Sequence, residues 1–136
     1  MNIYDDITLI YVSYKSVSLF KKNIHTIKLF NTIIVDNFGS EDLSIYLKDY
    51  PKIKYFKNSS NLGFGSASNL GVKKANTPYV ILLNPDITFD IKSIENLYKG
   101  FLLYDNAGVA GPSLYTTDGI KRSKKSEKIG KIREER

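Results

Sequence analysis

Short apolar runs alternate with segments of helical periodicity along most of this sequence, and no other feature limits the fold so strongly. The runs predict strands, which we expect at residues 7–13, 32–36, 53–57, 79–83 and 108–112. The segments between them predict helices over residues 17–30, 41–50 and 64–75 and after Asp90. Because neighbouring parallel strands need crossover connections of this length, the pattern predicts an α/β domain with a mostly parallel sheet flanked by helices.

The helical segments carry recognisable stripes and boundaries. The first has an apolar stripe at three- and four-residue spacing, made of Val17, Phe20, Ile24 and Ile27. In the second, Ser40 is a typical N-cap, Leu43 and Leu47 share one face, and Pro51 ends the helix. These signals predict two full helices that pack on the sheet through one face each.

The composition excludes several classes of site. The 136 residues contain no cysteine, so disulfides, thiolate nucleophiles and cysteine-based zinc sites are excluded. The only histidine, His25, lies in a lysine-rich helical segment and has no G-x-S-x-G motif to partner it, which favours a surface role. A metal here would need oxygen ligands, which favours a hard cation such as Mg²⁺ or Mn²⁺.

The positive charge is concentrated at the C-terminal end. Residues 121–136 hold eight basic and three acidic side chains, and so account for +5 of the net charge of +6. Such a run is typical of a solvated end, or of a patch that contacts anionic lipid or phosphate. No aromatic residues are interleaved with it, which argues against nucleic acid as a partner. With no signal peptide and no run of membrane-spanning length, we expect a cytoplasmic protein, either free or peripheral at the inner face of the membrane.

Polar residues follow the predicted strands at four consecutive exits. These exits are Ser13-Tyr14, Asp36-Asn37, the loop Asn58–Asn61 and the triplet Asn84-Pro85-Asp86. In open parallel sheets, ligands bind outside the carboxyl ends of the strands. The sequence therefore predicts that these groups line one rim and form the binding site.

Each of the two acids at these exits has two interpretations. Asp86 follows a buried strand and is restrained by Pro85, which suits a cation that bridges ligand phosphates, although Asn-Pro-Asp is also a common turn. Asp36 is placed to accept hydrogen bonds from a ribose or base, or to cap the turn that follows it. The residues alone leave both pairs of interpretations open.

The glycine-rich stretch from Asn61 to Ala75 matches neither common phosphate-binding motif. Ser68 stands where G-x-G-x-x-G needs its third glycine, and G-x-x-x-x-G-K-[ST] is absent. Gly63 and Gly65 would allow a ligand to approach the start of a helix whose free N–H groups favour an anion. The other interpretation is close helix-on-sheet packing through Ala67, Gly71 and Ala75, and the two are compatible.

Taken in order, these motifs resemble the N-terminal half of the family 2 glycosyltransferases, which have the GT-A fold. The motifs are "IIVDNFGSED", "NLGFGSASNLGVKKA" and "YVILLNPD", and the resemblance runs from about Ile7 to Gly119. The rhamnosyltransferase-like enzymes of bacterial surface polysaccharide biosynthesis are the subgroup it resembles most. The resemblance implies a nucleotide-sugar-binding domain over residues 1–112, followed over 113–136 by the start of an acceptor half that diverges into the basic tail.

The resemblance also implies roles for particular residues. The residues expected to bind the nucleotide sugar are Ser13, Tyr14, Asp36, Asn37, Asn61, Gly63, Phe64, Gly65, Asn69 and Asn84. Asn84 replaces the first acid of the family's D-x-D metal motif, so Asp86 would be the metal ligand, for Mg²⁺ or Mn²⁺. The implied reaction is transfer of a sugar from a dTDP- or UDP-linked donor to an acceptor hydroxyl with inversion, the acceptor being a saccharide or lipid-linked.

The resemblance does not supply a catalytic base, because the family's base lies beyond the point at which this chain ends. No acid after Asp90 has a matching context. Three hypotheses remain: a truncated transferase that keeps its donor-binding half, a module that binds nucleotide or nucleotide sugar without turnover, and a structural partner. Loss of the acceptor half would expose apolar surface, so we also expect marginal stability or self-association.

Overall fold

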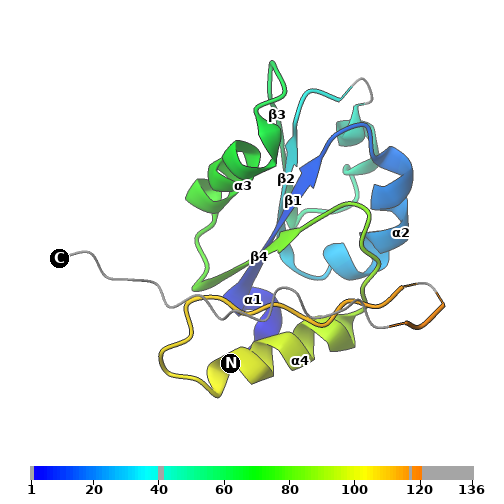
Figure 1. Cartoon of the computed structure of the whole chain (residues 1–136). Helices are drawn as coiled ribbons and strands as arrows, with labels where there is room; N and C mark the ends of the chain where they lie inside the picture. The colour runs from blue at the N-terminus through cyan, green and yellow to red at the C-terminus, as the bar shows by residue number, and fades with distance from the viewer. Residues whose placement is uncertain (1, 40–41, 117, 121–136) are drawn as a thin grey trace. The chain divides into compact units, whose positions relative to one another are not determined.

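The structure is a computed structural model that describes residues 2–39, 42–116 and 118–120. Its centre is a sheet of four parallel strands (Figure 1): β1 (Ile7–Ser13), β2 (Asn31–Asp36), β3 (Ile53–Lys57) and β4 (Tyr79–Leu83). Their order across the sheet is β3-β2-β1-β4. The predicted α/β class and parallel sheet are therefore confirmed, and each of these strands lies within one residue of its predicted bounds.

The helices of the first 90 residues lie around this sheet. They are α1 (Ile3–Asp6), α2 (Val17–Ile27), the 3₁₀ helix η1 (Leu43–Tyr46) and α3 (Gly63–Lys74). In Figure 1, α2 and α3 lie on opposite faces of the sheet. This is the layered arrangement that crossover connections between parallel strands produce.

Two predicted elements were wrong. The segment before Pro51 forms only the four-residue helix η1, capped by Asp42, whose side chain accepts a hydrogen bond from Ser44 N. Too few residues separate that cap from Pro51 to complete a stable α-helix; the proposed cap Ser40 lies outside the described residues. No strand forms at 108–112, because three of its five residues are glycine or proline, which weaken or interrupt a ladder.

The face of the sheet under α3 is an apolar core. Ile10 and Val12 of β1 and Ile33 and Val35 of β2 pack together with Ala67 of α3. A Cβ atom at position 71 would lie 2.5 Å from Ile10 Cγ2, so only glycine fits there. The helix-on-sheet interpretation of the glycine stretch is thus confirmed at Ala67 and Gly71.

The opposite face combines apolar and polar side chains. Phe20 of α2 meets the ring of Tyr11 edge-on, with 6.0 Å between ring centroids. The buried residues of α2 are Val17, Phe20, Asn23 and Ile27, so the observed stripe holds Asn23 where Ile24 was predicted. His25 is exposed, as predicted.

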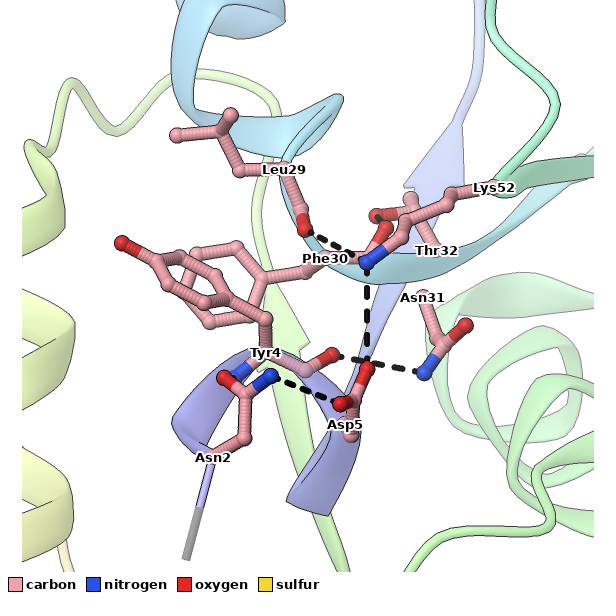
Figure 2. A network of polar contacts seen from close by, with 8 residues as sticks. All are labelled: Asn2, Tyr4, Asp5, Leu29, Phe30, Asn31, Thr32 and Lys52. Atoms are coloured by element: carbon pink, nitrogen blue, oxygen red, sulfur yellow. Dashed lines mark hydrogen bonds and ion pairs between the residues drawn. The ribbon is translucent and has the colours of Figure 1, made fainter.

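The N-terminal helix α1 is tied to the amino ends of β2 and β3 (Figure 2). Lys52 Nζ lies 3.8 Å from an Asp5 carboxylate oxygen and donates a hydrogen bond to Leu29 O. The ring of Tyr4 packs on that of Phe30 with 5.1 Å between centroids, and Asn31 donates to Tyr4 O. These contacts close the amino end of the sheet, away from the strand exits.

The chain divides into two compact units, one up to Asp90 and one from Ile91 onward. Within the second unit, α4 (Ile91–Leu102) buries Ile94 and Tyr98. No helix in the described part of the chain is long and apolar enough to cross a membrane. All the residues predicted to bind the nucleotide sugar or metal lie in the first unit.

Candidate nucleotide-sugar site

The four strand exits lie at one rim of the sheet, as the sequence predicted. Ser13 and Asp36 are register partners on β1 and β2, and Tyr11 is the partner of Leu83 on β4. Because all four strands are parallel, their exits follow one another in the order of the sheet. The predicted residues therefore come from neighbouring strands and the loops directly after them.

Asp36 is buried, and both of its carboxylate oxygens are engaged. Oδ1 accepts a hydrogen bond from Gly39 N at 2.8 Å, and Oδ2 accepts one from the Tyr55 hydroxyl at 2.5 Å. Burial and, next, this bond raise the pKa of Tyr55 above its ordinary value, so the hydroxyl stays a donor. Asp36 thus caps the turn after β2, and its contact with a ribose or base remains a prediction.

The turns after β1 and β2 share an unusual backbone. Lys15 and Phe38 have φ values of 50° and 67°, a backbone conformation that residues other than glycine rarely adopt. A Cβ atom at Gly39 would lie 2.9 Å from Asp36 Oδ1 and 3.3 Å from Lys15 N, so the two turns approach closely there. Strained backbone of this kind tends to gather at functional sites.

Asn37 organises the loop after β3. Its Nδ2 donates to Asn61 Oδ1 at 2.7 Å, while its Oδ1 accepts from Leu62 N at 2.9 Å and from Asn58 Nδ2 at 3.2 Å. Asn61 Oδ1 also accepts from Gly63 N. Asn37 and Asn61 thus come together as predicted, and their amides fix the loop that leads into α3.

The start of α3 is open. Gly63 has φ +78°, which explains the glycine, and a Cβ atom at Gly63 or Gly65 would meet nothing within 4 Å. Phe64 is 45% exposed and Asn69 is exposed as well. No side chain caps this helix. The predicted residues here face open space, and ligand contact remains their untested role.

The Asn84-Pro85-Asp86 segment is a β-turn. Ile87 N donates to Asn84 O at 3.3 Å, which places Pro85 and Asp86 at the two central positions. Asp86 has no positive φ, so the turn is of type I rather than type II. The turn interpretation is therefore correct, and it holds Asp86 directly at the end of β4.

The Asp86 carboxylate is exposed and has no hydrogen bond or ion pair with another described residue. Burial raises the pKa of Tyr11 to about 12; the Ser16 side chain partly offsets this, and the charge of Asp86 adds a smaller increase. Tyr11, Ser13 and the register partner Asp36 share one face of the sheet, since side chains alternate along a strand. Asp36 ends β2 and Asp86 follows β4, so the two acids lie at the carboxyl ends of parallel strands in one sheet.

These residues suit a divalent cation that takes most of its ligands from phosphate and water. No group of three or more His, Cys, Asp or Glu residues is assembled in the described ranges, so a cation held by protein ligands alone is not indicated there. One free carboxylate suits Mg²⁺ or Mn²⁺ whose other ligands are phosphate oxygens and water. Asp86 is the residue that would hold such an ion.

A shallow hollow lies at the opposite, amino-terminal rim. Its lining includes Thr8, Asn31, Lys52, Lys54, Lys74 and Asn76. Its volume of about 30 Å³ is water-sized, so it cannot hold a nucleotide. The Lys74 ammonium lies 4.1 Å from the centre of the Phe56 ring. This basic hollow is separate from the strand exits.

A match to a family model shows which protein family this chain belongs to. The glycosyl transferase family 2 model matches residues 8–136. The chain belongs to glycosyl transferase family 2. No curated protein matches the sequence.

The crystal structure of TarS from S. aureus is similar, with a TM-score of 0.61 and 18% sequence identity. The similarity covers 71% of this family 2 chain and 32% of the solved TarS chain, residues 1–349, so it spans about a third of that TarS chain. At this identity the similarity shows the fold alone, which is of the GT-A type expected from the sequence.

Three contributors near the rim were missed by the sequence analysis. They are Asn23, Tyr55 and the buried hydroxyl of Tyr11. Asn23 had a detectable signal, because it is a polar residue three positions after Phe20 and four before Ile27, on the apolar face of α2. Tyr55 had none, because its bond to Asp36 depends on the pairing of β2 with β3.

Proposed function

We propose that this chain binds the donor of a glycosyltransferase reaction, in which a sugar passes from a nucleoside diphosphate to an acceptor hydroxyl with inversion. The observation that carries the proposal is the rim itself. There a free carboxylate at the end of β4 lies beside the buried, hydrogen-bonded exits of β1 and β2. Membership of family 2 makes a nucleotide sugar the expected donor.

In this proposal the rim residues have different tasks. Asp36 and Asn37 hold the β2 exit and the loop before α3 in place, so that Tyr14 and Phe64, both exposed, can border the nucleotide. Asp86 would hold Mg²⁺ or Mn²⁺, which neutralises charge on the departing diphosphate. The resemblance to rhamnosyltransferase-like enzymes favours a dTDP-linked deoxysugar, with a UDP-linked hexose as the other candidate.

A non-catalytic binding module is the second candidate, because no carboxylate after Asp90 has the sequence context of the family's base. One of these carboxylates, Asp118, accepts a hydrogen bond from the Thr116 hydroxyl. We name no catalytic base. Measuring donor hydrolysis and transfer to saccharide or lipid-linked acceptors separates the two functions: turnover supports the transferase, and binding without turnover supports the module.

The proposed partners beyond the donor follow from the sequence. The basic residues 121–136, outside the described residues, would contact anionic lipid at the inner face of the membrane. A cytoplasmic location and self-association are parts of the same proposal. Nucleic acid is not among the proposed partners.

The decisive test is metal-dependent binding. UDP and dTDP are titrated into the full chain by calorimetry with and without Mn²⁺, for the wild type and for Asp86→Ala. We expect Mn²⁺ to tighten wild-type binding and Asp86→Ala to lose this increment entirely, because the free carboxylate is gone. Asp49→Ala, which removes an exposed acid before β3, is the matched control and should bind as the wild type does.

Absence of any binding to the wild type, or an unchanged Mn²⁺ increment in Asp86→Ala, would overturn the proposed site. The second result would also leave the structural-partner hypothesis standing, since that hypothesis assigns no role to Asp86.

A further inference from the structure

Asn23 is the only polar residue among the four buried positions of α2. Its side chain is 2% exposed. A buried amide costs free energy unless its donors and acceptor are hydrogen-bonded. A residue of this kind on an otherwise apolar stripe therefore needs an explanation that the packing of α2 does not supply.

The Asn23 amide donates a hydrogen bond to the turn that contains Asp86. Asn23 Nδ2 donates to Ile87 O at 2.8 Å, across 64 residues of sequence. Ile87 directly follows Asp86, and its N–H closes the turn onto Asn84 O at 3.3 Å. Both backbone polar groups of Ile87 are thus held, one by the turn and one by α2.

The polar groups on this side are not fully paired. Among the described residues, Asn23 Oδ1 is buried without a hydrogen-bond partner, and the buried Tyr11 hydroxyl has Ser16 beside it but no hydrogen bond of good geometry. Tyr11 packs on Phe20, one helical turn before Asn23, and the charge of Asp86 reaches its hydroxyl. Most buried polar atoms in folded proteins are paired, so unpaired ones mark a place where stability was not the only requirement.

We infer that Asn23 is a positioning residue for Asp86, which fixes the Asn84–Ile87 turn from inside and thereby sets where the carboxylate is presented. The inference rests on the proposed function of Asp86 as a cation ligand. Physically, the turn is exposed at Asp86, and its far end is held by its own 3.3 Å closing bond and by the Asn23 bond. Without Asn23 the carboxylate would sample more orientations, and binding an ion through one protein ligand would cost more ordering entropy.

The test is the affinity for Mn²⁺ of the full chain saturated with UDP, measured by the Mn²⁺ electron paramagnetic resonance signal. Asn23→Leu keeps the branched shape of the side chain and removes both the donor and the unpaired oxygen. We expect its Mn²⁺ affinity to fall roughly tenfold, the lower end of what outer-shell partners of metal ligands usually supply. Asn23→Gln keeps an amide donor and should recover part of the loss.

A purely structural role is separated by a matched control. Ser68 is also buried with an unpaired side-chain oxygen, but it lies on α3 at the opposite face of the sheet. Ser68→Ala should therefore leave Mn²⁺ affinity unchanged, whatever it does to the melting temperature. If Asn23→Leu does not fold, Asn23→Ala removes the same donor with less steric demand and carries the same expectation.

The outcomes distinguish this inference from the proposed function. Wild-type Mn²⁺ affinity in Asn23→Leu, together with its loss in Asp86→Ala, would overturn the positioning role alone. Absence of Mn²⁺ binding in the wild type with UDP would overturn both. Weaker binding in Asn23→Leu, with partial recovery in Asn23→Gln and none lost in Ser68→Ala, is the result we expect.

Discussion

The two faces of the sheet bury different kinds of side chain. Beneath α3, the buried core is built from aliphatic side chains of β1 and β2 that meet Ala67 and Gly71. On the α2 face, buried polar groups gather toward the carboxyl ends of the strands, namely Tyr11, Ser13, Asp36 and Asn23. The first face supplies cohesion, and the second carries the groups that shape the strand exits.

The difference shows how a small domain can hold a polar rim. Burying polar groups weakens a fold unless each one is paired, so the polar face depends on the apolar face for stability. Asp36 is fully paired, whereas Tyr11 and Asn23 are paired only in part or not at all. Variants on the two faces should therefore differ in size of effect and in the property that they change.

The largest effect is expected on the apolar face, at Gly71. Gly71→Val places a branched side chain where even a Cβ atom would lie 2.5 Å from Ile10 Cγ2. Overpacking of this kind, added to the poor helix propensity of valine, should lower the free energy of unfolding by about 3 kcal/mol or more. Urea denaturation followed by circular dichroism measures it.

Gly65→Ala on the same helix is the matched control for Gly71→Val. A Cβ atom at Gly65 meets nothing within 4 Å, and the change should stabilise the chain by roughly 0.5–1 kcal/mol, because alanine loses less conformational entropy in a helix. If Gly71→Val were as stable as the wild type, α3 would not be packed on β1 as described, and the contrast between the faces would fail.

A smaller effect is expected on the polar face, at Asp36. Asp36→Ala leaves Gly39 N and the Tyr55 hydroxyl without their acceptor. We expect the free energy of unfolding to fall by about 2 kcal/mol, the usual cost of breaking a buried hydrogen bond to a charged group. The pKa of Tyr55 should fall as well, because the Asp36 bond and charge both help to raise it.

The phenolate absorbance of the folded protein, titrated upward in pH, follows Tyr55, and Tyr55→Phe identifies its contribution. A stability loss without any change in the Tyr55 titration would mean that the two side chains are not bonded. The burial of Tyr55 persists in Asp36→Ala, so its pKa should stay above that of an exposed tyrosine.

The arrangement of the strands was predictable because it depends on local pattern and on one topological rule. Apolar runs predicted the four strands of the sheet, and crossover lengths predicted that the strands run parallel. The gathering of Ser13, Asp36 and Asp86 at one rim followed from that rule alone. The prediction of a strand at 108–112 was wrong because it relied on the apolar residues there and gave too little weight to the two glycines and the proline.

What lay beyond prediction was which polar groups pair across long separations. Asn37 bonds to Asn61 across 24 residues, and Asn23 to Ile87 across 64. Such bonds depend on register and on the depth to which a helix packs, which periodicity does not specify. The stripe of α2 shows the limit: the pattern favoured Ile24, whereas Asn23 is the buried residue.

The smallest effect on stability at neutral pH is expected at Tyr11. A variant there should change how stability depends on pH more than it changes stability at pH 7. Tyr11→Phe removes a buried hydroxyl that makes no hydrogen bond of good geometry in the described part of the chain, so at pH 7 the free energy of unfolding should change by less than about 1 kcal/mol. Burial, with a smaller contribution from Asp86, raises the pKa of Tyr11 from 10.0 to about 12. The folded wild type therefore keeps a proton that the unfolded chain releases, and its stability falls as pH rises from 10 to 12.

Tyr11→Phe lacks this contribution, so its stability should decline less steeply over that window, as urea denaturation at successive pH values would measure. All other titratable groups, Tyr55 among them, are the same in both proteins, so their contributions cancel in the comparison. Adding Asp86→Ala to the wild type should flatten the same window slightly, since it removes only the lesser of the two causes that raise the pKa. Parallel pH profiles for wild type and Tyr11→Phe would mean that the hydroxyl reaches solvent, and Tyr11 would then not be a buried polar group of this face.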